Sequence, residues 1–132
     1  MQHILIVEDD PMMAGFEELS LRQIGGFTVT VSDNPDEVLD LVGSGNIDAV
    51  VMDVSLGKKG DGIKLTRQLK DDPKSKSVPI LLATAHADDD RFHTLIEASG
   101  ADDRISKPFR HIGELAEKVT KILANQPPME KR

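Results

Sequence analysis

Short apolar runs recur along the chain, separated by longer segments in which apolar residues have helical spacing. The runs cover residues 4–7, 27–31, 47–52, 80–83 and, shortest of all, the region around 104–105. Most of them are continuously apolar, which is typical of parallel strands that are buried on both faces. The run at 27–31 instead alternates apolar and polar residues, which predicts a half-exposed strand at an edge of the sheet.

Five amphipathic helices are predicted between and after these strands. Their expected ranges are 11–24, 34–42, 61–70, 88–98 and from about 108 to 124. Asp10-Pro11 and Asn34-Pro35 mark two helix starts, because the polar residue can cap the helix and proline suits its first position. The side chains expected to face the core are Met12 or Met13, Phe16, Leu19 and Ile24 in the first helix, Phe92, Leu95 and Ile96 in the fourth, and Ile112, Leu115, Ala116, Val119, Ile122 and Leu123 in the last.

The strict alternation of strands and helices predicts the fold class. It indicates an α/β protein of (βα)5 type, a doubly wound five-stranded parallel sheet whose right-handed crossovers place helices on both faces. We predict one domain at residues 1–124. Residues 125–132 are expected to form a polar tail or the start of a linker, because Asn125-Gln126-Pro127-Pro128 breaks the last helix.

Charge and composition narrow the class of protein. The net charge of −7 argues against a nucleic-acid surface, because binding to phosphate backbones requires clustered lysine and arginine. The apolar runs are far shorter than a membrane span, and no signal-peptide pattern is present, so a cytoplasmic protein is expected. The absence of cysteine excludes disulfides and thiol chemistry.

Charged and polar side chains follow several of the predicted strands at the point where each ends. Asp53 ends the third strand, and Glu8-Asp9-Asp10 follows the first. If these strands are neighbours, the carboxylates meet in the crevice beyond the strand ends, where their repulsion requires a hard cation such as Mg²⁺. With a hydroxyl from Thr84 and a cation from Lys107, the group has the parts needed to form an aspartyl-phosphate.

The chain resembles the receiver domains of two-component response regulators over about residues 3–124. The resemblance rests on six motifs that occur in the family's order and spacing. They are Ile4-Leu5-Ile6-Val7-Glu8-Asp9-Asp10-Pro11, Val51-Met52-Asp53, Asp61-Gly62, Pro79-Ile80 to Thr84-Ala85, Gly100-Ala101-Asp102-Asp103 and Lys107-Pro108-Phe109. The resemblance implies a flavodoxin-like sheet with strand order 2-1-3-4-5.

The same resemblance implies a role for each residue of the site. Asp53 looks like the phosphoacceptor and, with Asp9, a direct ligand of Mg²⁺. Glu8 would act on the metal through water, and the backbone carbonyl of Ser55 would be the third protein ligand.

Two further residues would respond to the phosphoryl group. Thr84 resembles the switch hydroxyl that turns toward it, and Lys107 resembles the lysine that pairs with it. In this family the peptide bond between Lys107 and Pro108 is typically cis.

The sequence departs from the family pattern at three places. Gly57 stands where proline is usual, and Asp61-Gly62 comes one residue late, which makes the loop after Asp53 longer. Arg104 replaces an aromatic residue that usually moves with the switch hydroxyl, and it could exchange acidic neighbours instead. His86 lies where it could modulate removal of the phosphoryl group.

A phosphorylation-activated switch is the function that the resemblance implies, and it is not a conventional enzyme. The phosphoryl donor would be a histidine kinase or a phosphotransfer protein. An output partner would bind the face formed by helix 88–98, the strand near Arg104 and the last helix, and a homodimer is a further option. Because several aspartates lie on that face, the partner surface is expected to be partly basic.

The alternative is a receiver-like binding module that acts without phosphorylation, as the altered loop and Arg104 suggest. An aspartyl-phosphate phosphatase is disfavoured because Ser55 occupies the position of its second acid, and a flavin-binding protein because carboxylates follow the first strand.

Overall fold

The five predicted strands form one parallel sheet in the order β2-β1-β3-β4-β5. In the computed structural model, which describes residues 1–85 and 89–125, the strands are β1 (His3–Val7), β2 (Thr28–Ser32), β3 (Ala49–Asp53), β4 (Ile80–Thr84) and β5 (Asp103–Ser106). The order and the fold class are those predicted. β2 lies at one edge of the sheet, as its alternating pattern indicated, and every residue of the central strand β3 is buried.

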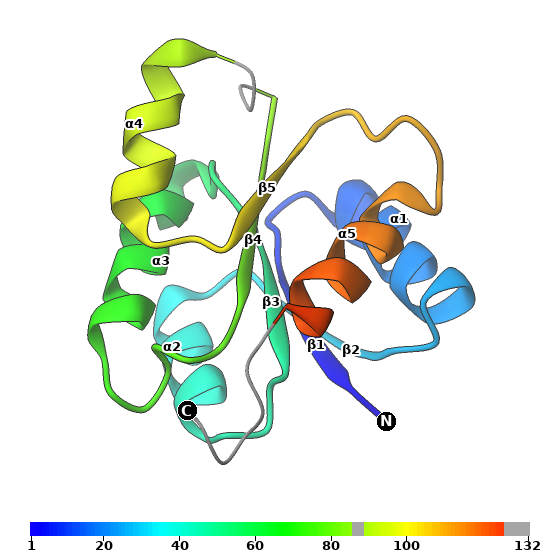
Figure 1. The fold of residues 1–132 in the computed structure, drawn as a ribbon, viewed down its shortest axis with the longest axis horizontal. Helices are drawn as coiled ribbons and strands as arrows, with labels where there is room; N and C mark the ends of the chain where they lie inside the picture. The colour runs from blue at the N-terminus through cyan, green and yellow to red at the C-terminus, as the bar shows by residue number, and fades with distance from the viewer. Residues whose placement is uncertain (86–88, 126–132) are drawn as a thin grey trace.

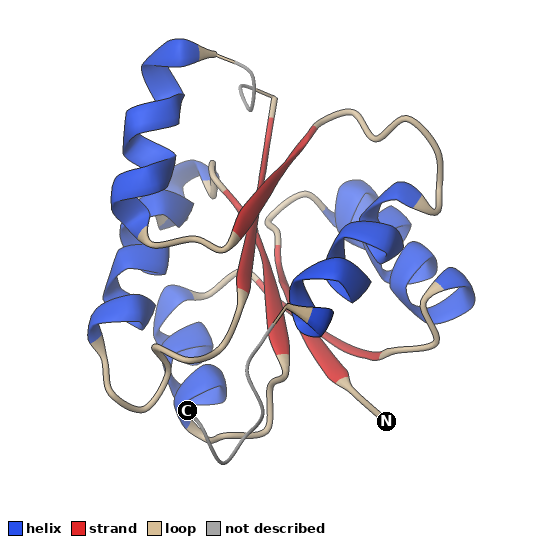
Figure 2. Ribbon diagram, in the orientation of Figure 1, coloured by secondary structure: helices blue, strands red, loops and turns tan. Residues whose placement is uncertain are grey.

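Helices cover both faces of this sheet (Figure 1). They are α1 (Pro11–Leu19) with a π-helical continuation η1 (Ser20–Ile24), α2 (Pro35–Gly43), a short 3-10 turn η2 (Gly57–Lys59), α3 (Gly62–Asp71), α4 (Asp90–Ser99) and α5 (Glu114–Ala124). Figure 2 shows α2, α3 and α4 on one side of the strands and α1 and α5 on the other. None of these helices, in the part of the chain that the structure describes, is long and apolar enough to cross a membrane.

The predicted helix caps are present at the starts of α1 and α2. The side chain of Asp10 accepts a hydrogen bond from the backbone N–H of Met12, and Asn34 accepts bonds from Asp36 and Glu37. Pro11 and Pro35 occupy the first helical positions. The dipeptides therefore set these two helix starts as the sequence indicated.

The face that α1 buries differs from the predicted face. The core side carries Ala14, Glu17 and Leu21, which are at most 7% exposed. Of the apolar side chains expected there, four lie outward, with exposed fractions of 84% for Met12, 37% for Phe16, 46% for Leu19 and 55% for Ile24, whereas Met13 is partly buried. The prediction failed because Glu17, a carboxylic acid, lies at the centre of the buried face. The spacing of the apolar residues therefore indicated the neighbouring face of the helix. Part of the outward stripe is covered, since the ring of Phe16 stacks on Phe109 with centroids 5.9 Å apart.

The last two helices also depart from their predicted limits or packing. Ile96 of α4 is buried as predicted, whereas Leu95 is 51% exposed. α5 begins at Glu114, because a turn follows Pro108 and the Glu114 carboxylate accepts a hydrogen bond from the backbone N–H of Arg110 at 2.8 Å. Ile112 therefore precedes the helix and is 38% exposed. The other predicted core positions of α5 are buried, except Leu123, which is partly buried against the core.

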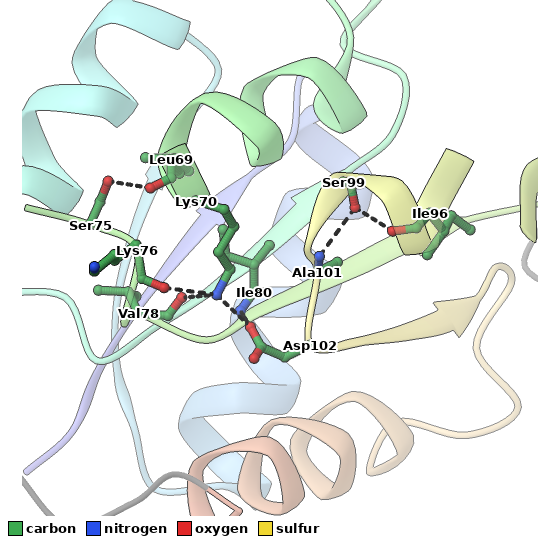
Figure 3. A network of polar contacts seen from close by, with 10 residues as sticks. All are labelled: Leu69, Lys70, Ser75, Lys76, Val78, Ile80, Ile96, Ser99, Ala101 and Asp102. Carbon is green, nitrogen blue, oxygen red and sulfur yellow. Dashed lines mark hydrogen bonds and ion pairs between the residues drawn. The ribbon is translucent and has the colours of Figure 1, made fainter. Parts of the chain in front are cut away.

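Lys70 at the end of α3 ties three segments together at the amino ends of the strands (Figure 3). Its Nζ donates hydrogen bonds to the carbonyl oxygens of Lys76 at 3.3 Å and Val78 at 2.9 Å. It also pairs with Asp102 Oδ2 at 2.8 Å, and the same oxygen accepts the backbone N–H of Ile80 at 2.7 Å. Asp102 is thus already engaged within the fold, in an ion pair with Lys70.

Replacing Lys70 with methionine should lower the free energy of unfolding by about 2 kcal/mol, because Asp102 loses its ion pair and two carbonyls lose their donor. Urea unfolding measures this loss. Lys64→Met is the matched control, since Lys64 is exposed on the same helix, and it should change stability by less than about 0.5 kcal/mol. Equal effects of the two variants would contradict the structural role of Lys70.

Candidate functional site

The carboxyl ends of the central strands form a cavity that contains all six residues predicted for the site. β1 leads into Glu8, β3 ends at Asp53, and β4 ends at Thr84. Because β1 and β3 are neighbours, Glu8 and Asp9 lie beside Asp53. The cavity has a volume of about 520 Å³ and is lined by Glu8, Asp9, Asp10, Met13, Asp53, Val54, Ser55, Thr84, Ala85, Phe92 and Lys107.

Three carboxylates form a compact cluster within this cavity. One oxygen each from Glu8, Asp9 and Asp53 lies within 4.8 Å of the others. Glu8 and Asp53 are 4% and 8% exposed, whereas Asp9 is exposed at the rim. Asp10 instead caps α1, because its Oδ1 accepts a hydrogen bond from the backbone N–H of Met12 at 3.0 Å. A compact set of carboxylate oxygens open to water on one side fits the ligand preferences of Mg²⁺.

Lys107 neutralises part of this negative charge. Its Nζ lies 2.8 Å from Glu8 Oε1 and 3.0 Å from Asp53 Oδ1, so one cation bridges two carboxylates. Burial alone would lower the pKa of Lys107, but the hydrogen bonds and charges of Glu8 and Asp53 outweigh burial and raise it. Burial and the hydrogen bond with Asp53 raise the pKa of Glu8, despite the opposing effect of Lys107. The lysine therefore remains charged, and the carboxylates compete for it.

Glu17 of α1 lies behind Glu8, and sequence reasoning missed it. Its side chain is 1% exposed, and its Oε1 has no hydrogen-bond partner among the described residues. Burial, together with the charge of Glu8 and a hydrogen bond between the two carboxyl groups, raises the pKa of Glu17 to about 8. The available signal in the sequence was that Glu17 shares a helix face with Ala14 and Leu21, which are buried.

Thr84 and Ser55 line the same cavity as the carboxylate cluster. Thr84 is 4% exposed, and its carbonyl oxygen accepts the backbone N–H of Lys107 at 3.0 Å, which brings the lysine to the strand end. The peptide bond between Lys107 and Pro108 is cis, as the resemblance implied. Ser55 follows β3, and its backbone pairs with Asp61 in an isolated antiparallel bridge.

The loop after Asp53 accommodates its extra residue in a short 3-10 turn, η2. The turn begins at Gly57, with a φ angle of +61°, and is followed by Gly60, with a φ angle of +143°. The loop then returns to β3, where the N–H of Gly62 donates to the carbonyl of Val54 at 2.7 Å. The added residue therefore forms a closed turn beside the cavity.

Arg104 of β5 contacts a histidine. Its Nη1 lies 3.0 Å from Nδ1 of His93 in α4, and His93 Nε2 lies 3.1 Å from Glu97 Oε1. The position thus links β5 to α4 through a polar side chain rather than an aromatic ring. The predicted exchange between acidic partners stays a prediction, and His86 lies outside the described residues.

Comparison with known proteins gives a consistent result over nearly the whole chain. The sequence model of the response regulator receiver domain family matches residues 4–120. The chain is 34% identical over 127 residues to the response regulator ArlR of Staphylococcus haemolyticus, covering 96% of this chain and 55% of ArlR. It therefore spans about half the length of ArlR and of several similar regulators.

Other similar proteins have nearly the same length as this chain. The chemotaxis protein CheY of Pseudomonas aeruginosa is 34% identical over 121 residues, which cover 90% of this chain and 94% of CheY. The solved receiver domain of a sensor histidine kinase from the same species is 28% identical, with a TM-score of 0.82, and the match covers 94% of this chain and 98% of that domain. That structure holds a magnesium ion in its active-site cleft.

Proposed function

The chain belongs to the response regulator receiver domain family of two-component signalling, and from that premise we propose that it accepts a phosphoryl group on Asp53 and thereby changes its partner binding. Its partner class includes a histidine kinase, as for other two-component receivers. We infer that a phosphohistidine, on the kinase or on a phosphotransfer protein, supplies the phosphoryl group.

The single observation that carries this proposal is the arrangement around Asp53. Its carboxylate ends β3 inside the cavity, with Lys107 Nζ 3.0 Å from Oδ1 and two further carboxylates nearby. In the transfer, an Asp53 oxygen forms the new bond to phosphorus while the bond from phosphorus to the histidine nitrogen of the donor breaks. We expect Lys107 to hold a phosphoryl oxygen in exchange for one of its carboxylate contacts.

We infer that Asp9, Asp53 and the carbonyl of Ser55 hold Mg²⁺ beside the phosphoacceptor, with Glu8 acting on the metal through water. One oxygen from each of the three carboxylates lies within 4.8 Å of the others, which is close enough for a single ion, and Ser55 lines the same cavity. When bound, Mg²⁺ supplies positive charge to the phosphoryl oxygens. We expect Thr84, which is buried at the end of β4 and lines the cavity, to offer its hydroxyl to the same group.

The response to phosphorylation is expected at the face of α4, β5 and α5. Lys107 directly follows β5, and Arg104 of the same strand contacts α4 through His93. A movement of Lys107 or Thr84 toward a phosphoryl group can therefore change how β5 packs on α4. We propose that an output partner binds this face and distinguishes the two states.

Incubation with acetyl phosphate and Mg²⁺, followed by intact-mass measurement, tests this function. The wild-type chain should gain one phosphoryl mass, and both Asp53→Asn and chelation of the metal should abolish the gain. Asp40→Asn is the matched control, because Asp40 is an exposed acid on α2 and should leave the gain intact. A wild-type chain that stays unmodified, yet binds its partner, would instead support the binding module that acts without phosphorylation.

A further inference from the structure

We propose that Gly57 is a positioning residue for Asp9. It leaves the space in which the Asp9 carboxylate joins the cluster with Glu8 and Asp53. The inference rests on the proposed Mg²⁺ site and adds a requirement that belongs to the unusual loop of this chain. By this inference, a residue that has no side chain determines where the carboxylate of one metal ligand lies.

The contact between Gly57 and Asp9 leaves no room for a side chain on the loop. A Cβ built on Gly57 would lie 2.8 Å from Asp9 Oδ2 and 4.0 Å from its Cγ. Carbon and oxygen atoms that are not bonded do not approach this closely without repulsion. The backbone at Gly57 also has a φ angle of +61°, which favours glycine and excludes proline, whose φ is fixed near about −65°.

The loop cannot move aside to relieve this contact. Leu56, directly before Gly57, is fully buried, and its N–H donates to the carbonyl of Gly60 at 3.2 Å. The bridge between Ser55 and Asp61 closes the loop at its base. Asp9, by contrast, is exposed and has a short side chain that can rotate, so the carboxylate is the group that yields.

Displacement of the Asp9 carboxylate should weaken Mg²⁺ binding strongly. Mg²⁺ demands near-ideal octahedral geometry with short ligand distances, so a shift of less than 1 Å matters. The carboxylates of Glu8 and Asp53 cannot follow, because both are buried and bound to Lys107. Gly57 thus determines whether the exposed ligand and the two buried carboxylates can act together.

Mg²⁺ titration of Gly57→Ala by calorimetry tests the inference, since the chain has no Trp or Tyr for intrinsic fluorescence. The matched controls are Gly26→Ala and Gly45→Ala, whose φ angles are +71° and +85° and whose added Cβ would meet nothing within 4 Å. All three variants should lose about 1 kcal/mol of stability from the backbone conformation. We expect only Gly57→Ala to bind Mg²⁺ at least about tenfold more weakly and to lose the rise in Tm that Mg²⁺ produces.

A second variant keeps the inference testable if Gly57→Ala unfolds. In an Asp9→Ala background the clashing oxygen is absent, so Gly57→Ala should then cost no more stability than Gly45→Ala in the same background. Mg²⁺ affinity of Gly57→Ala equal to that of the two controls would overturn the inference. A wild-type chain that does not bind Mg²⁺ would instead remove the proposed metal site itself.

Discussion

Gly62→Ala is expected to destabilise the chain by about 3 kcal/mol or more, the largest loss that a single added methyl group should cause here. A Cβ at this position would lie 1.9 Å from the carbonyl oxygen of Asp53, 2.8 Å from its carbonyl carbon and 3.0 Å from Cα of Val54. These are backbone atoms, which no rotamer change can move. The first turn of α3 therefore packs directly on the strand end that carries Asp53, and only glycine permits this contact.

Urea unfolding measures the loss, with Gly15→Ala as the matched control. Gly15 also lies within a helix, but its added Cβ meets no atom within 4 Å, so this variant should gain about 0.5–1 kcal/mol. An ordinary point mutation changes the free energy of unfolding by about 1 kcal/mol. If Gly62→Ala loses no more than this, α3 does not pack tightly on Asp53. The gain at Gly15 separates the general helix preference from the local clash.

Glu17→Leu is expected to stabilise the chain by about 2–4 kcal/mol above pH 8, because leucine fills the space without a buried charge. The pKa of Glu17 is raised from 4.5 to about 8 in the folded chain. Between these pH values the folded state keeps a proton that the unfolded state releases. The wild-type chain therefore loses stability as the pH rises through this window and reaches its lowest value above pH 8.

Urea midpoints from pH 4.5 to 8.5, measured in a chelator so that no metal is bound, test this linkage. The stability difference between Glu17→Leu and the wild type should be smallest near pH 4.5 and increase toward pH 8. Glu18→Leu is the control, because Glu18 is only partly buried and its carboxylate pairs with Arg22 of η1. A stability difference between Glu17→Leu and the wild type that does not change with pH across this range would contradict the interpretation of Glu17 as a buried neutral acid.

Most of the sheet was predictable because each of its first four strands has a signal that depends only on its own residues, whereas β5, with the sequence DRIS, has little of one. Continuous apolar runs such as 4–7 and 80–83 identify strands buried on both faces, and the alternating residues near Val29 identified the edge strand. The inward face of α1 was not predictable in this way, because Glu17 occupies a core position and Phe16 beside it is exposed. The decisive contact, between Glu17 and Glu8, joins residues whose meeting depends on tertiary packing.

The site was predictable to the extent that topology brings strand ends together. Glu8 and Asp53 lie at the carboxyl ends of the neighbouring strands β1 and β3, so the strand order alone makes them neighbours. Lys107 follows the edge strand β5, and its contacts with both carboxylates depend on its side chain reaching past the end of β4. The contact between Gly57 and Asp9 depends on a φ angle in an irregular loop, which residue identity alone does not fix. The partner of Arg104 likewise depends on how α4 is placed against β5.

The stacked rings of Phe16 and Phe109 give this chain a spectroscopic reporter. Its aromatic rings come from four phenylalanines and four histidines, with no Tyr or Trp, so the aromatic region of its NMR spectrum contains few overlapping signals. The two rings lie 5.9 Å apart, and Phe109 is two residues beyond Lys107. Ring-current shifts of these protons therefore report the position of the Lys107 segment directly, without an added label.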